Sequence, residues 1–298
     1  MAITWGEAEL LIYLARENVI KGRVATFGRM TMLVNGKDVK ELAKRLDGYT
    51  PAVAQLPDGD IDDQAFFAAL GVASLTSIDA MDVDRPTMIA DLSRPLPEKL
   101  HGSFDAVLDS GTMEHVANFA SCLQNSCRLV KVGGYVVHSI PSTNFLDHGY
   151  FSVSPIFYVD FFEVNRWRRH FLALYGTIWT KTNAERTYWS YTPEVFGQAE
   201  WTGQFNRPMS VASVAQRTPE STYSFEGVIQ REYKPVAAAA DGSAATKIER
   251  IRSFGKALAK SNPGLASLGA QFWYWWIARH TLAKTRFRLA SAPALLSD

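Results

Sequence analysis

The sequence predicts a doubly wound α/β fold with a mostly parallel sheet, and three observations support this prediction. Residues 104–109 form a short apolar run that ends on Asp109, and residues 135–140 form a second run that Pro141 closes. Between them, residues 117–131 carry apolar side chains at helical spacing. Two buried strands joined by a helix make a βαβ unit with parallel strands. In such sheets, ligands bind beyond the carboxyl ends of the strands.

Two glycines, Gly133 and Gly134, follow the predicted helix at 117–131. Glycine often ends a helix because it adopts the left-handed backbone conformation at low cost. We therefore expect this pair to stop the helix and to separate it from the strand at 135–140.

Upstream of this unit, helices and strands alternate, as a doubly wound sheet requires. Helices are expected where apolar residues recur at helical spacing, at 2–18, 38–46 and 62–70, the last ended by Gly71. Strands are expected at 23–27, 75–78 and 87–90. The glycines and prolines of residues 47–60 predict a loop between the second and third helices.

Downstream, the pattern predicts a helix at 158–167, strands at 170–175 and 210–216, and an extended piece at 225–233. The polar and aromatic stretch 180–209 is expected to be an insertion or lid. The chain is thus predicted to divide into an α/β domain (1–234), an Ala/Gly/Ser-rich linker (235–246) and a helical appendage (247–298). Two helices, 247–260 and 265–289, are expected in the appendage.

The charge of the chain is unevenly distributed. The net charge is only +1, yet the segment from Lys247 to Arg288 holds nine Lys or Arg residues and one acid, Glu249. Five consecutive aromatic residues, 272–276, accompany these charges. Either this aromatic face packs on the body or on a second copy of the chain in a homodimer, or residues 247–290 bind an anionic membrane surface. No nucleic-acid motif accompanies the charges, so no nucleic-acid partner is expected.

Composition sets further limits. The apolar and charged fractions, 47% and 20%, are ordinary for a globular protein, and no apolar run is long enough to span a bilayer. The N-terminus lacks a signal-peptide pattern. A cytoplasmic location is expected, peripheral to the inner membrane face if the appendage binds lipid. Cys122 and Cys127 are the only cysteines and are predicted to be reduced thiols; no second ligand pair has zinc-site spacing, so no metal site is expected.

The segment FDAVLDSGTMEHV, followed by RLVKVGGYVV, resembles the fourth-strand region of class I S-adenosylmethionine-dependent methyltransferases. The resemblance covers about residues 20–235 and is strongest over 77–155. It implies a Rossmann-like, seven-stranded methyltransferase fold, S-adenosylmethionine as cofactor, and methyl transfer to a small-molecule acceptor. The expected acceptor group is a hydroxyl of a sugar or another polar metabolite. The alternative is a non-catalytic binding or scaffolding protein of this fold that has lost cofactor affinity.

Four residues are candidates for holding the adenosine and carboxylate ends of the cofactor. Gly28 permits one close backbone approach after the first strand, and Arg29 could pair with the cofactor carboxylate. The resemblance implies that Asp79 binds the ribose and that Asp91 lies near the adenine, although Asp91 also fits a local turn cap. The first turn departs from the family: it has one glycine, and Gly28 precedes Asp79 by more than twice the usual ~20 residues. This departure favours the non-catalytic alternative.

Three more candidates follow the strand at 104–109. Asp109 lies at the carboxyl end of that strand, on the expected binding edge. The resemblance implies that Glu114 and His115 line the cofactor pocket near its methionine end. In the alternative interpretation, they are a helix-entry residue and a histidine with structural partners.

The segment from Asn144 to Ser152 is the expected acceptor-binding loop, because it follows the next strand on the same edge. It resembles a histidine-glycine-aromatic loop in a bacterial branch of these methyltransferases. Methyl transfer to oxygen needs a base near neutral pH, which histidine supplies, so His148 is the expected base and His115 a second candidate. Tyr150 is its predicted hydrogen-bonding partner and, with Asn144 and Asp147, an expected contact of the acceptor.

Overall fold

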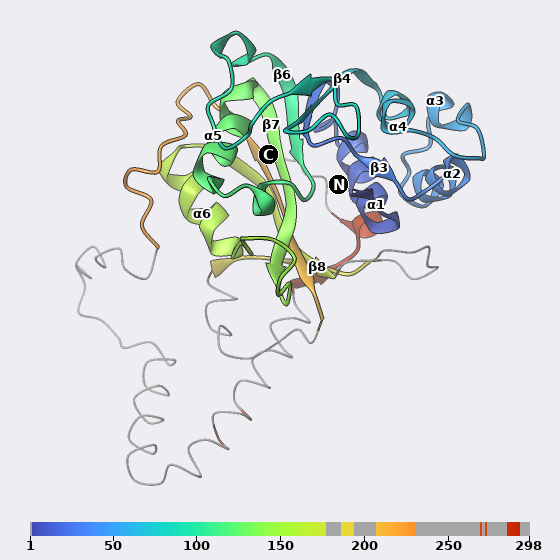
Figure 1. The fold of residues 1–298 in the computed structure, drawn as a ribbon. Coiled ribbons are helices and arrows are strands. Elements are labelled where there is room, and N and C mark those ends of the chain that lie inside the picture. Colours follow the sequence, from blue (N-terminus) through green and yellow to red (C-terminus); the bar gives the residue numbers. More distant parts are fainter. Residues whose placement is uncertain are drawn as a thin grey trace.

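The computed structural model of the protein describes residues 2–176, 186–193, 207–230 and 285–292, together with Gly269 and Phe272. Its main element is a sheet of nine strands in the order β11-β9-β8-β10-β7-β6-β2-β4-β5 (Figure 1). The strands are β2 (Gly22–Phe27), β4 (Val72–Asp79), β5 (Met88–Ile89), β6 (Phe104–Asp109), β7 (Val130–Thr143), β8 (Arg168–Gly176), β9 (Tyr188–Ser190), β10 (Met209–Gln216) and β11 (Arg286–Phe287). A small second sheet pairs β1 (Ala2–Ile3) with β3 (Thr31–Met32).

The sheet is parallel in one half and antiparallel in the other. β5, β4, β2, β6 and β7 pair in parallel, whereas β10 is antiparallel to both β7 and β8. The seven expected strands are therefore β5-β4-β2-β6-β7-β10-β8. β9 and β11 extend the sheet by two antiparallel strands that the sequence analysis did not anticipate.

Helices cover both faces of the sheet, as a doubly wound fold requires (Figure 1). One group is α1 (Trp5–Arg16), α2 (Gly36–Arg45), α3 (Pro51–Ala54) and α4 (Asp63–Ala69); the other is α5 (Phe119–Leu129) and α6 (Pro155–Val164). Strand residues alternate between the two cores: Ala106 and Leu108 belong to the α1 side, and Val107 between them belongs to the α5 side.

Most predicted elements are confirmed, with ends within a few residues. The predicted strand at 104–109 coincides with β6, and the predicted helices at 2–18, 38–46, 62–70, 117–131 and 158–167 correspond to α1, α2, α4, α5 and α6. Cys122 and Cys127 are free and fully buried beside the sheet. The predicted lid at 180–209 and most of the appendage lie outside the described residues.

Three expectations are wrong. The loop expected at 47–60 contains α3, which begins because the Thr50 side chain accepts a hydrogen bond from the Val53 N–H and Pro51 suits the first helical position. The helix expected at 265–289 does not reach its predicted end, since Arg286 and Phe287 pair with β9. The extended piece expected from residue 225 contains no strand over 225–230.

The expected role of Gly133 and Gly134 is also wrong. The helix α5 ends at Leu129, and β7 begins at once with Val130 and runs through both glycines. The pairing of β6 with β7 shifts register before Tyr135, and Gly133 has a φ of +82°. The glycines therefore form an irregularity within a strand rather than the end of a helix.

Gly134→Ala is expected to destabilise the fold by about 1–3 kcal/mol, the usual cost of forcing extra volume into a packed site. A Cβ at this position would lie 2.6 Å from the backbone oxygen of Asp105, which cannot rotate away. Urea unfolding monitored by circular dichroism measures the effect. Gly59→Ala is the matched control, because its Cβ would meet no atom within 4 Å. Equal stability of the two variants would contradict the expected clash.

Within the described part of the chain, no helix combines the length and apolarity needed to cross a bilayer. The described end of the appendage packs against the main fold: Leu289 is buried in the α1-side core, and Phe287 packs against that core. The homodimer and membrane-surface alternatives for residues 247–290 remain predictions.

Candidate active site

The first turn and the ends of the neighbouring strands lie level with one another. Phe27 at the end of β2 pairs with Ile78 on one side and Asp109 on the other. The Gly28 N–H donates to the Ile78 carbonyl oxygen at 2.6 Å, and Gly28 has a φ of +78°. The Thr112 hydroxyl donates to the Phe27 carbonyl oxygen at 2.8 Å, so the loop after β6 is fixed to the first turn. This edge is the expected ligand edge.

Asp79 ends β4 beside the first turn. Its Oδ1 accepts a hydrogen bond from the Met81 N–H at 3.3 Å, and the carboxylate is partly exposed. Two apolar side chains nearby face solvent: Met81 is 65% exposed and Ile89, at the end of the adjacent strand β5, is 57% exposed. This arrangement suits a nucleoside, because the carboxylate can accept hydrogen bonds from ribose hydroxyls while the apolar side chains contact the flat face of the base.

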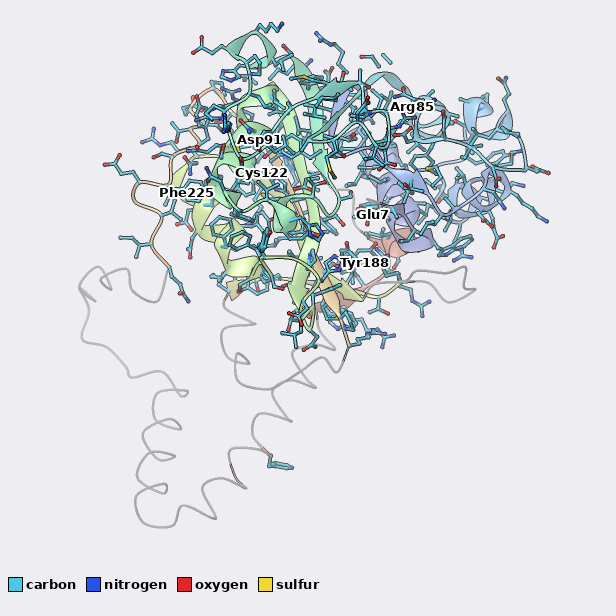
Figure 2. All side chains as sticks on the ribbon, viewed as in Figure 1. Glu7, Arg85, Asp91, Cys122, Tyr188 and Phe225 are labelled. Atoms are coloured by element: carbon cyan, nitrogen blue, oxygen red, sulfur yellow. The ribbon has the colours of Figure 1, made fainter. Side chains whose placement is uncertain are left out.

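Asp91 is exposed at the same end of the sheet and is labelled in Figure 2. Its Oδ1 accepts from the Ser93 N–H at 2.8 Å, and Arg94 Nε lies 3.4 Å from its Oδ2. The hydrogen bonds from Ser93 hold the pKa of Asp91 below its usual value. These contacts are those of the local turn cap, and they leave the exposed carboxylate accessible to a ligand.

Arg29 is already paired. Its Nε and Nη2 contact Oδ1 of the buried Asp63 at 3.0 and 2.9 Å, and its Nη1 donates to the Arg85 carbonyl oxygen at 2.9 Å. These contacts tie the first turn to α4 and to the loop after β4. To reach a cofactor carboxylate, Arg29 would have to leave a buried carboxylate behind, which is costly.

Asp109 is fully buried and shapes the turn after β6. Its carboxylate accepts hydrogen bonds from the Thr112 N–H at 2.8 Å and the Met113 N–H at 3.1 Å. Burial raises the pKa of Asp109 to about 6, although these N–H groups oppose the shift. We infer that Asp109 stabilises the turn after β6 and that this turn places Glu114 at the ligand edge of the sheet.

Glu114 is the most unusual residue of the site. Its side chain has no exposed surface, and neither carboxyl oxygen has a hydrogen-bond partner. Burial raises the pKa of Glu114 to about 8, and the nearby Asp109 carboxylate adds to the shift. Buried carboxyl groups are normally hydrogen-bonded, so an orphaned one indicates a functional position.

Two histidines flank this carboxyl group. The distance from Glu114 Oε1 is 3.8 Å to His115 Nε2 and 3.7 Å to His148 Nε2. The two imidazole rings lie 5.2 Å apart, and both are partly exposed, 48% for His115 and 39% for His148. Partial burial, followed by the neighbouring His148, lowers the pKa of His115. We call these three residues the Glu114 cluster.

Backbone contacts bring His148 to Glu114. The N–H groups of Tyr150 and Phe151 both donate to the Glu114 carbonyl oxygen, at 2.8 and 3.2 Å. A Cβ on Gly149 would lie 3.0 Å from Glu114 Cγ, so only glycine fits easily between the loop and Glu114. The loop after β7 is therefore fixed on the turn after β6, and the predicted pairing of this loop with the cofactor edge is present.

The other predicted acceptor contacts occupy the rim of this loop. Asn144 and Asp147 both have positive φ, +61° and +58°, and Asn144 Nδ2 donates to the Arg207 carbonyl oxygen at 2.9 Å. The Tyr150 side chain is 74% exposed. These three residues lie on the loop after β7, and their roles toward an acceptor remain predictions.

A further buried acid, Glu7 of α1, was not predicted from the sequence; it is labelled in Figure 2. Its carboxylate accepts hydrogen bonds from Ser110 Oγ at 2.8 Å and Ser139 Oγ at 3.1 Å, at the ends of β6 and β7. Burial raises the pKa of Glu7, whereas the buried Arg186, whose guanidinium stacks 4.3 Å from the Tyr175 ring centre, opposes the shift. Two acids, Glu7 and Glu9, among the apolar residues at the start of this helix were the available signal.

The comparisons with known proteins can now be placed on this geometry. Residues 73–138 match the family model described as a methyltransferase domain. Over this segment the chain is therefore similar to methyltransferase domains. The matched segment runs from β4 into β7, so it includes Asp79, Asp91, Asp109 and Glu114. No curated protein matches the chain.

Several solved methyltransferase structures match the chain at low sequence identity. A putative methyltransferase from Bacillus halodurans is 12% identical, with 71% of this chain and 98% of that chain covered and a TM-score of 0.38. The 1,6-didemethyltoxoflavin-N1-methyltransferase of Burkholderia thailandensis, solved with 1,6-didemethyltoxoflavin and S-adenosylhomocysteine, is 11% identical (72% and 79% covered, TM-score 0.37). A Haloferax volcanii methyltransferase in complex with the activator Trm112 is 13% identical (72% and 90% covered, TM-score 0.41).

The methyltransferase match implies S-adenosylmethionine as cofactor, and the residues at the edge fit its adenosine part. Asp79 would bind the ribose hydroxyls, Asp91 the adenine amino group, and the exposed Met81 and Ile89 would contact the faces of the adenine. The positive φ of Gly28 gives the close backbone approach that a ligand at the first turn needs. For the carboxylate end, the predicted partner Arg29 is occupied by Asp63.

Proposed function

We propose that this protein transfers the methyl group of S-adenosylmethionine to a hydroxyl of a small polar acceptor, such as a sugar or another metabolite. The observation that carries the proposal is the Glu114 cluster, which combines an unpaired buried carboxyl group with two accessible histidines beside the cofactor edge. A hydroxyl acceptor must lose a proton during transfer, and this cluster can receive it.

The cofactor supplies a methyl group already activated on a sulfonium, so most of the rate gain comes from holding the acceptor oxygen in line with it. His148 is the expected base, because its ring is partly exposed and its Nε2 lies 3.7 Å from Glu114 Oε1, which leaves Nδ1 to receive the proton of the acceptor. Glu114 is the acid beside this histidine: the positive charge of the imidazolium favours the ionised form of Glu114, which would in turn stabilise the imidazolium. His115 lies on the other side of the same carboxyl group and is the second candidate for this role.

The acceptor would enter over the loop that carries His148. Leu146 and Tyr150 on this loop are 92% and 74% exposed, so its rim is open. Asn144 and Asp147 belong to the same loop. An open rim with amide, carboxylate and phenol groups fits a small hydroxylated molecule better than an apolar one.

Calorimetry with S-adenosylmethionine and S-adenosylhomocysteine tests the cofactor half of the proposal. Transfer of a radiolabelled methyl group to a panel of sugars and hydroxylated metabolites tests the acceptor half. The single-glycine first turn and the occupied Arg29 are the features that favour a non-catalytic scaffolding protein. Absence of binding for both cofactor forms would establish that alternative.

Asp79→Ala is expected to weaken S-adenosylmethionine binding by about 10- to 100-fold, because charge-assisted hydrogen bonds to the ribose are worth about 1.5–3 kcal/mol. Calorimetry measures the change. Asp60→Ala, which removes an exposed carboxylate from the loop before α4, is the matched control and should bind as the parent does. Unchanged affinity in Asp79→Ala would remove Asp79 from the cofactor site.

A further inference from the structure

The Glu114 cluster has the composition of a metal site as well as that of an acid–base pair. One carboxylate oxygen and two imidazole nitrogens, from Glu114, His115 and His148, lie within 4.8 Å of one another. Two histidines and one carboxylate are a common ligand set for divalent first-row transition metals, and three protein ligands leave positions open for a substrate.

The distances are close to those that an ion requires. The oxygen–nitrogen separations are 3.7 and 3.8 Å, and ligand atoms at about 2.0–2.1 Å from a tetrahedral zinc stand about 3.4 Å apart. Both histidines are partly exposed, so small rotations of their rings can close this gap. Their exposure also gives an ion a path into the site from solvent.

The burial of Glu114 points to a ligand independently of the spacing. Its side chain is fully buried, and both of its oxygens are without hydrogen-bond partners. Among the described residues, the two histidines that would share the ion have nitrogens 3.7 and 3.8 Å from Glu114 Oε1. An orphaned buried carboxyl group needs a compensating partner, and a cation between it and the histidines provides one.

The fold holds the three ligands in place. His115 is adjacent to Glu114 in the chain, and the hydrogen bonds from Tyr150 and Phe151 to the Glu114 carbonyl oxygen fix the loop carrying His148. The missing side chain of Gly149 permits this contact. The site is thus assembled by backbone contacts between two loops.

We propose that Glu114, His115 and His148 bind one divalent transition-metal ion, such as Zn²⁺, Mn²⁺ or Fe²⁺, with positions left open toward the acceptor side. The use of this ion rests on the proposed function: a bound cation would lower the pKa of a coordinated hydroxyl, so that the acceptor releases its proton to solvent water without a histidine base. The acceptor oxygen would then form the bond to the methyl carbon as the sulfur–methyl bond breaks and S-adenosylhomocysteine leaves. In that form, His148 is a ligand. Binding of the ion itself requires neither cofactor nor acceptor.

The test is titration of the full-length, chelator-treated and desalted protein with Zn²⁺ and, as a spectroscopic probe, Co²⁺. We expect one ion per chain by calorimetry and a visible Co²⁺ absorption band from nitrogen and oxygen ligands. Glu114→Gln and His148→Gln should each weaken binding at least about 100-fold, since each removes a direct ligand, and loss of a residue that only hydrogen-bonds a ligand already costs about 10–100-fold. Circular dichroism establishes that both variants are folded.

His101→Gln is the matched control. His101 precedes β6 and Glu114 follows it, so the two lie about 20 Å apart along the strand, and the control should bind as the parent does. Absence of a stoichiometric ion on the parent, or full binding by both ligand variants, would overturn the proposal. Because no cofactor is present in this titration, its outcome is independent of whether methyl transfer occurs.

Discussion

His148→Gln is expected to lower methyl transfer by about 10²–10⁴-fold, the usual contribution of a positioned acid–base group. The loss has the same direction whether His148 acts as a base or holds an ion that activates the acceptor. Affinity for S-adenosylmethionine should be nearly unchanged, because His148 lies on the loop after β7, whereas the adenosine candidates lie beyond β4 and β5. Single-turnover methyl transfer and calorimetry with the cofactor measure the two effects separately.

Two observations would sharpen this result. Chelator treatment that abolishes parent activity, with recovery on adding Zn²⁺ or Mn²⁺, would assign the loss to the ion; activity that survives chelation would assign it to the imidazole as base. The matched control is again His101→Gln, which should retain parent turnover. Normal turnover in His148→Gln on the true acceptor would remove His148 from the reaction.

His138→Gln is expected to make the protein markedly less sensitive to acid. His138 lies in β7 with no exposed surface; its Nε2 lies 3.0 Å from Ser126 Oγ, and its ring stacks on Tyr158 and Phe162. Burial lowers the pKa of His138 to about 3, whereas an unfolded chain has a histidine pKa of about 6.5. Between pH 3 and pH 6.5, the unfolded state therefore binds a proton at His138 that the folded state does not bind.

This difference makes neutral His138 stabilise the fold above pH 6.5. Its contribution to the free energy of unfolding is lost as the pH falls from 6.5 toward 3, by up to about 5 kcal/mol. Glutamine does not titrate and can keep a hydrogen bond to Ser126, so the free energy of unfolding of the variant should fall less over this range. Urea unfolding at a series of pH values measures both slopes. Parallel curves for parent and variant would contradict the assignment.

The elements that could be predicted from the sequence are those whose apolar pattern is local. The run at 104–109 is a buried strand bounded by polar residues, and it coincides with β6. The start of β7 could not be predicted, because glycines after a helix usually end it, and only the pairing of Val130 with Phe104 shows that the strand begins first. Likewise, pairing with β9 overrides the helical spacing around Arg286.

In the candidate site, too, residues in a local sequence pattern could be predicted, whereas contacts between distant segments could not. Asp79 and Asp109 were predicted at strand ends, because a strand followed by an acid can be recognised in the sequence. Contacts between distant segments could not be predicted. The pairing of Arg29 with Asp63 depends on where α4 packs, and the approach of His148 to Glu114 depends on Gly149. The expectation of no metal rested on cysteine spacing, which says nothing about a histidine from another loop.

The edge strand β11 has a consequence for the order in which the protein can fold during synthesis. Leu289 is 1% exposed and belongs to the same apolar core as Ile3 and Leu11. Chains fold as they leave the ribosome, beginning with their N-terminal parts. Here the first helix and the last described strand cover one core, so that core cannot close until nearly the whole chain has emerged. Until then, α1 and the strands beneath it present apolar surface to the solvent and to chaperones.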